Sequence, residues 1–147
     1  FKAFDNIITK FNIEKIKTIG DSYMCVGGLP KANTTHAENV VNAAIEILNF
    51  MEVHNREKKA NGELHFEIRI GINTGTVVAG IVGVKKFAYD IWGDTVNIAS
   101  RLESSGEPGK INISGSTYEL VKDKFNCTYR GKIEAKNKGE VDMFFVS

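Results

Sequence analysis

Apolar positions near the start of the chain change their spacing from one segment to the next. In residues 1–11 they recur every third or fourth position, which predicts a helix. Two apolar runs follow at 14–19 and 22–26, on either side of Gly20 and Asp21. Because a short Gly-containing break between apolar runs is typical of a hairpin, we expect two paired strands with their tip at this Gly-Asp pair.

Residues 35–62 carry the pattern of a longer helix. Its apolar stripe is made by Val41, Ala44, Ile45, Leu48 and Met51. Thr35 stands three residues before Glu38, a spacing that predicts a capping box at the start of the helix. We expect the helix to end in the polar run 55–62.

Strand patterns and a helix pattern alternate in the middle of the chain. Apolar and polar positions alternate strictly over 64–72, which predicts a half-buried strand. The apolar run 76–82 follows a turn and predicts the hairpin partner of that strand. Residues 87–92 predict a short strand or an extended loop, and 95–104 predict a helix.

The C-terminal third completes a mixed order of helices and strands. Residues 111–113 predict a short strand, and Ser116 with Glu119 predicts a second capping box at the start of a short helix. The segments 127–135 and 141–146 predict a hairpin. The whole order indicates an α+β protein, with helices on one face of a mainly antiparallel sheet.

Composition and charge narrow the possible partners. The chain has 147 residues, enough for one domain. Lys plus Arg is 19 and Asp plus Glu is 18, so a formal net charge of +1 argues against nucleic acid or a membrane surface as the partner. Cys25 and Cys127 lie far apart and suit free thiols in a reducing compartment.

The phosphate-binding loops GxxxxGK[ST] and GxGxxG are absent. Two other polar stretches are candidates for the functional site. In the first, Lys17 interrupts an apolar run and Asp21 follows a Gly; alone, these fit an edge charge and a turn residue. In the second, Asn97 and Arg101 are four residues apart and share one helix face. Spacing alone favours a solvated Asn-Arg pair over a functional one.

Four segments together resemble the class III nucleotidyl cyclase catalytic domain. They are EKIKTIGDSYM, IRIGINTGTVVAGIVG, YDIWGDTVNIASR and YRGKIEAKNKGEVDMFFV. The resemblance covers essentially the whole of 1–147 and implies a ferredoxin-like βαββαβ-derived sandwich. The family's first motif, roughly F-x-D-[IL]-x-G-F, is absent, so we expect the chain to lack the first strand and one metal-binding Asp.

The resemblance implies the reaction and its cofactors. ATP or GTP is cyclised as its ribose 3′-hydroxyl attacks the α-phosphate and pyrophosphate leaves. Two Mg²⁺ or Mn²⁺ ions, held by two Asp side chains, assist the attack and the departure. Asp21 matches the second of these Asp residues. The active sites of such a homodimer lie at the subunit interface, and we expect this chain to dimerise in the same way.

The same resemblance assigns the base-reading residues. Lys17 and Asp90 match the pair that contacts the purine, and Ile91 matches a further substrate contact. Adenine offers a donor at N6 for Asp90 and an acceptor at N1 for Lys17. Guanine reverses both, and relatives that use GTP typically carry Glu and Cys at these positions. We therefore expect ATP to be the substrate.

Four further residues match phosphate and ribose contacts. Asn97 matches the residue that orients the ribose, and Arg101 matches the one that stabilises the charged pentavalent phosphate. Lys136 and Arg69 match contacts to the triphosphate. The resemblance implies that Lys17 and Asp21 of one chain serve different sites of the dimer.

Two alternatives to an adenylyl cyclase remain. The absence of the first motif is compatible with a cyclase-homology module that dimerises or binds nucleotide without turnover. A guanylyl cyclase is disfavoured by Lys17 and Asp90. Such domains are commonly attached to sensor, receptor or membrane segments, which we expect outside this chain, with the catalytic domain in the cytoplasm.

Overall fold

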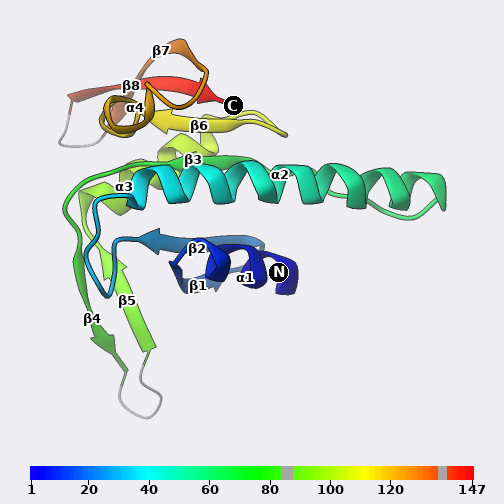
Figure 1. The fold of residues 1–147 in the computed structure, drawn as a ribbon, viewed down its shortest axis with the longest axis horizontal. Coiled ribbons are helices and arrows are strands. Elements are labelled where there is room, and N and C mark those ends of the chain that lie inside the picture. Colours follow the sequence, from blue (N-terminus) through cyan, green and yellow to red (C-terminus); the bar gives the residue numbers. More distant parts are fainter. Residues whose placement is uncertain (84–87, 136–138) are drawn as a thin grey trace.

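The computed structural model describes residues 1–83, 88–135 and 139–147 (Figure 1). Its helices and strands are α1 (Lys2–Lys10), β1 (Ile13–Ile19), β2 (Ser22–Gly27), α2 (His36–Ala60), β3 (Ile70–Ile72), β4 (Val78–Val82), β5 (Ala88–Trp92), α3 (Asp94–Ser104), β6 (Ile111–Ser114), α4 (Gly115–Val121), β7 (Cys127–Ala135) and β8 (Gly139–Val146). The α+β class is confirmed. Within the described ranges, no helix is both long and apolar enough to cross a membrane.

The strands of the described residues fall into separate sheets. The largest has the order β3-β6-β8-β7, in which β3 and β6 run parallel and the other neighbours run antiparallel. The hairpins β1-β2 and β4-β5 each form a sheet of their own. Figure 1 shows the β4-β5 hairpin as an arm that extends away from the rest of the protein.

The expected pairing of 64–72 with 76–82 is wrong. Regular strand structure is confined to Ile70–Ile72, which pairs with β6, and β4 pairs with β5 instead. The alternating apolar side chains before β3 do not enter a core, because Leu64 is 84% exposed and Phe66 is 70% exposed. Alternation alone therefore predicted a longer strand than the sheet accommodates.

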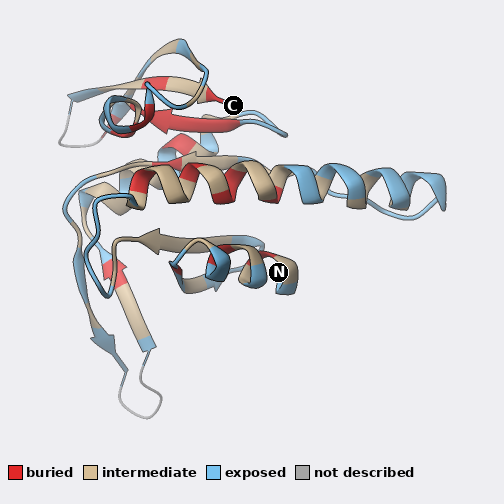
Figure 2. Ribbon diagram, in the orientation of Figure 1, coloured by how far each residue is buried: buried red, intermediate tan, exposed pale blue. Residues whose placement is uncertain are grey.

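Helix α2 lies between the large sheet and the β1-β2 hairpin (Figures 1 and 2), with a hydrophobic cluster on each side. On the side of the large sheet, Val41 packs with Ile72, Ile113 and other buried residues. On the other side, Ala43 and Ile47 pack with residues of α1 and β1. The helix thus joins the β1-β2 hairpin to the large sheet, which places two otherwise separate parts of the protein in one body.

Helix α2 ends at Ala60, inside the polar run 55–62, as expected. Figure 2 shows the C-terminal half of this helix largely exposed. Arg56 pairs with Glu52 at 3.1 Å, one helical turn away, and Lys58 pairs with Glu63 at 2.8 Å. The Arg56–Glu52 pair joins successive turns of α2 and so stabilises its exposed end.

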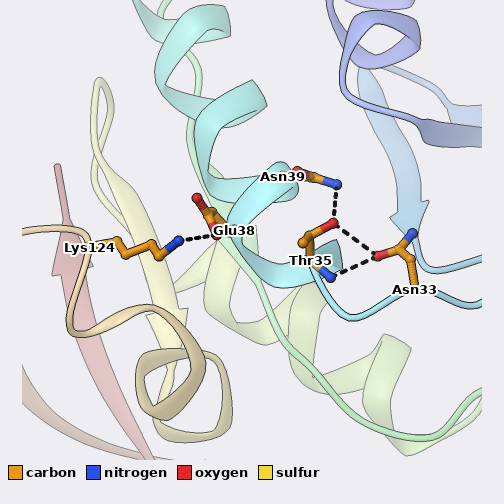
Figure 3. A network of polar contacts seen from close by, with 5 residues as sticks. All are labelled: Asn33, Thr35, Glu38, Asn39 and Lys124. Atoms are coloured by element: carbon orange, nitrogen blue, oxygen red, sulfur yellow. Dashed lines mark hydrogen bonds and ion pairs between the residues drawn. The ribbon is translucent and has the colours of Figure 1, made fainter.

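The two expected capping boxes are wrong as well. Thr35 is the N-cap of α2, but its Oγ1 accepts a hydrogen bond from Asn39 Nδ2 at 3.1 Å, while Glu38 pairs with Lys124 at 3.1 Å (Figure 3). In α4 the N-cap is Ser114, whose Oγ accepts from the backbone N–H of Thr117. Ser116 Oγ instead donates to the Thr74 backbone oxygen at 2.9 Å, so Glu38 and Ser116 both have partners in other segments.

Candidate active site

A β-bulge in β1 separates two lysines that a regular strand would place on one face. Lys15 lies opposite Cys25 and Lys17 lies opposite Met24, so Ile16 is the extra residue. Because Cys25 and Met24 are consecutive, the two lysines face opposite sides of the hairpin. Lys15 Nζ lies 3.4 Å from an oxygen of Asp5 in α1, which leaves Lys17 to face the other way.

Lys17 reaches Asp90 in β5, 73 positions further along the chain. The Lys17 Nζ donates to Asp90 Oδ2 at 2.9 Å, and the other carboxylate oxygen accepts from the backbone N–H of Ile91 at 2.8 Å. The hydrogen bond from Lys17 is the main cause that lowers the pKa of the Asp90 carboxyl. The structure thus brings together the two residues expected to read the base, with the buried Ile91 beside them.

Asp21 lies at the tip of the β1-β2 hairpin, exposed to solvent. Gly20 before it has φ 59°, in the left-handed region that glycine adopts without strain. Along the hairpin, Asp21 lies on the order of 10 Å from Lys17. The structure does not bring Asp21 together with the Lys17-Asp90 pair.

The metal expectation rests on Asp21. A carboxylate oxygen is a suitable hard ligand for Mg²⁺ or Mn²⁺. However, over residues 1–83, 88–135 and 139–147 no group of three or more His, Cys, Asp or Glu side chains is placed to hold a metal ion. The described residues therefore supply one candidate ligand and do not form a complete metal site.

Helix α3 presents Asn97 and Arg101 on an exposed face. The opposite face, at Ala99 and Glu103, packs directly on Gly71 of β3. A Cβ at Gly71 would lie 2.2 Å from the Glu103 backbone nitrogen, so the contact requires a glycine. Because side chains four residues apart share a face, this packing fixes the direction in which Asn97 and Arg101 point.

Arg101 also contacts β7. Its Nη2 donates to the backbone oxygen of Glu134 at 2.7 Å, near the end of that strand. Lys136, the expected triphosphate contact, lies outside the described residues, two positions after Glu134 in the chain.

Arg69 lies apart from the exposed face of α3. Its guanidinium forms an ion pair with Glu103 at 3.1 Å, on the side of the helix that faces β3. In this arrangement the structure does not bring Arg69 together with Asn97 and Arg101. Its expected role in binding the triphosphate stays a prediction.

The pattern-based reasoning missed two residues that hold the end of α3. Asn112 Nδ2 donates to the backbone oxygen of Leu102 at 2.9 Å, and Arg130 Nη1 donates to that of Ser105 at 3.0 Å. One signal was available in the sequence, because Asn112 interrupts the apolar run of a short strand. Burying a polar side chain without a hydrogen-bond partner is unfavourable, so an asparagine in such a run predicts a partner.

A cavity of about 860 Å³ among the described residues lies elsewhere. It is bounded by the start of α3, by α4 and by β8, with Trp92 and Tyr118 among its lining residues. Lys17, Asp21, Asp90, Asn97 and Arg101 do not line it. This cavity is therefore separate from the expected site residues.

Curated relatives include both kinds of cyclase. Residues 1–147 match the family described as the adenylate and guanylate cyclase catalytic domain. An adenylate cyclase of Mycobacterium tuberculosis (strain ATCC 25618 / H37Rv) is 38% identical over 146 residues, which cover 99% of this chain and 32% of that protein. The guanylate cyclase soluble subunit beta-2 of Rattus norvegicus is 41% identical over 148 residues, covering 99% of this chain and 21% of that protein. The chain thus spans about a third or less of these relatives.

Solved structures agree with the sequence matches. The adenylyl cyclase CyaB from P. aeruginosa has a TM-score of 0.92 at 34% identity, and the similarity covers 99% of this chain and 77% of that chain. The guanylate cyclase domain of RhGC from Catenaria anguillulae, in complex with GTP, has a TM-score of 0.90 at 38% identity, covering 99% and 78%. The chain therefore belongs to the adenylate and guanylate cyclase catalytic domain family.

Proposed function

We propose that this cyclase domain is an adenylyl cyclase, which converts ATP to 3′,5′-cyclic AMP and pyrophosphate. The observation that carries the proposal is the 2.9 Å contact between Lys17 and Asp90. It joins a donor and an acceptor from distant parts of the sequence at one place, as recognition of a base edge requires.

The chemistry of this pair favours adenine. Asp90 can accept a hydrogen bond from the N6 amino group, and Lys17 has three N–H donors, one of which can reach N1. Guanine would set its N1–H against the Lys17 ammonium and its O6 against the Asp90 carboxylate. Unpaired or opposed polar groups in a binding site discriminate strongly, so GTP should be a poor substrate.

The exposed face of α3 supplies the proposed catalytic groups. The ribose 3′-oxygen attacks the α-phosphorus and loses its proton, while the bond to the bridging oxygen breaks and pyrophosphate leaves. Asn97 would orient the ribose, and Arg101 would stabilise the negative charge that develops on the α-phosphate. Asp21 would be a ligand of the Mg²⁺ or Mn²⁺ ions that such domains use in general.

We also propose that the active site forms between two copies of the chain. Asp21 lies at the hairpin tip, away from Lys17 and Asp90, so one copy does not gather all the groups around one nucleotide. The β4-β5 arm exposes apolar side chains, namely Val78, Ile81, Val82 and Trp92. Exposed apolar groups on a projecting hairpin are typical of a surface that pairs with a partner.

The deciding experiment is an assay of product. The purified protein is incubated with Mn²⁺ and ATP and separately with GTP. Cyclic AMP without cyclic GMP supports the proposal. Cyclic GMP alone would identify a guanylyl cyclase, and ATP binding without product would identify a non-catalytic module.

A change of base preference tests the pair itself. Lys17→Glu with Asp90→Cys should relax or reverse the preference for ATP over GTP, because the donor and acceptor roles change. The ratio of kcat/KM for the two nucleotides measures this. Lys15→Glu is the matched control, because Lys15 lies on the other side of the bulge. Unchanged ATP selectivity in the double variant would contradict the assignment.

A further inference from the structure

A buried asparagine contacts the end of the helix that carries Asn97 and Arg101. Asn112 in β6 has 0% of its surface exposed, and its Nδ2 donates to the backbone oxygen of Leu102 at 2.9 Å. Leu102 directly follows Arg101 and is itself fully buried. A tether at this carbonyl therefore acts on the helix one residue away from the proposed catalytic arginine.

The backbone at the end of α3 leaves the Leu102 carbonyl available for this donor. The Ser105 N–H donates to the Arg101 oxygen at 2.8 Å, and the Gly106 N–H donates to the Glu103 oxygen at 3.1 Å. Carbonyls in the last turn of a helix lack intrahelical donors, and buried ones need a partner from elsewhere. The asparagine amide supplies that partner and so caps the helix from the sheet.

The stability of the core alone does not explain an amide at this position. Asn112 Oδ1 is buried, and no donor among the described residues reaches it. A buried polar atom without a partner destabilises the folded state. The neighbours Ile111 and Ile113 are apolar and pack in the cluster under α2. The role of the Asn112 amide is therefore the hydrogen bond that its Nδ2 donates to α3.

A second tether comes from a bulge in β7. The register of β7 and β8 shifts between Tyr129 and Gly131, which leaves Arg130 as the extra residue. Its Nη1 donates to the backbone oxygen of Ser105 at 3.0 Å, and its guanidinium carbon lies 4.0 Å from the centre of the Phe145 ring. The end of α3 is thus held from two strands of the large sheet.

We infer that Asn112, supported by Arg130, is a positioning residue for the cyclase reaction. It fixes the end of α3 so that Asn97 and Arg101 point towards the reacting phosphate and ribose. This inference rests on the proposed function. Because Lys17 and Asp90 lie on β1 and β5, away from this tether, nucleotide binding should depend on Asn112 much less than turnover does.

The test compares two buried substitutions in the same strand. Asn112→Leu removes the donor at similar volume, and Ile113→Ala removes core packing on the opposite face without touching the α3 carbonyl. Both are measured in the full-length protein for kcat, KM and thermal unfolding. We expect Asn112→Leu to lower kcat by about 100-fold, with KM changed by less than about 3-fold, because small misplacement of catalytic groups is costly. Ile113→Ala should retain kcat even where it unfolds at a lower temperature.

A second variant and a second readout keep the test decisive. Arg130→Met removes the other tether and should lower kcat with little change in KM. It replaces Asn112→Leu in the test if that variant does not fold. Hydrogen exchange at the Ser105 and Gly106 amides should speed up in both tether variants and not in Ile113→Ala. Equal losses of kcat in the tether and control variants would overturn the inference. A wild-type protein that forms no cyclic nucleotide would overturn the proposed function together with it.

Discussion

The alternation of side chains along β1 is interrupted at Ile16, and this single extra residue separates Lys15 from Lys17. Sequence spacing places both lysines on one face of a strand, and it cannot reveal a bulge. The candidate pair of Lys17 and Asp90 was nevertheless predicted, because it came from motif resemblance and not from alternation. The Asn112 tether was missed because a hydrogen bond to a backbone carbonyl leaves no motif in the sequence.

At the scale of one residue, the proposed role of Arg101 separates turnover from binding. Arg101→Ala should lower kcat by about 100-fold or more, because a donor aimed at developing charge acts mainly in the transition state. The affinity for ATP, measured by calorimetry, should stay near normal.

Arg56→Ala is a matched control for that change, because Arg56 is exposed on α2 and pairs with Glu52. Its kcat should match that of the wild type. If ATP affinity fell together with turnover in Arg101→Ala, the arginine would be a ground-state binding residue instead.

At the scale of elements, the contact between α3 and β3 depends on one glycine. Gly71→Ala would place a Cβ 2.7 Å from the Ala99 oxygen and closer still to the Glu103 nitrogen, and both are backbone atoms. The helix would have to move away from the strand. We expect the free energy of unfolding in urea to fall by about 3 kcal/mol.

Gly115→Ala provides the comparison for Gly71→Ala. The nearest heavy atom to a Cβ at Gly115 is Asp142 Cβ at 3.4 Å, an ordinary contact at the start of α4. Gly115→Ala should change the free energy of unfolding by less than about 1 kcal/mol. Equal unfolding midpoints for the two variants would show that α3 can shift from β3 without cost.

The order and type of the elements followed from periodicity, but several of their limits did not. Helix α1 and the β1-β2 and β7-β8 hairpins lie where spacing predicted them. The end of α2 also lies in the predicted polar run, whereas β4 pairs with β5 and not with the segment 64–72. The two capping boxes did not form because Glu38 pairs with Lys124 and Ser116 contacts Thr74, partners that no local pattern encodes.

At the scale of the whole molecule, the β4-β5 arm projects from the rest of the protein (Figure 1), and we expect it to contact the partner copy in the proposed dimer. Ile81 is 71% exposed on it. Ile81→Asp should shift a dimer towards monomer in sedimentation velocity and lower the cyclase rate in parallel, because a charge is costly in an apolar interface.

Leu120→Asp is the matched control for the arm, because Leu120 is 57% exposed on α4. Its sedimentation coefficient and its cyclase rate should remain those of the wild type. A dimer that persists in Ile81→Asp would place the interface on another surface.

The separation of Asp21 from Lys17 along one hairpin has a consequence for mixtures of defective chains. With Arg101 acting in the same site as Lys17, Asp21→Ala and Arg101→Ala should each be inactive alone, yet random pairing makes half of the dimers mixed. In each mixed dimer one site carries both defects and the other carries neither, so about a quarter of the wild-type rate should return. Cyclic AMP formation after co-expression of the two variants measures the recovered rate. No recovery would mean that each copy holds a complete site. In genetic terms, two null alleles would complement each other within a single gene.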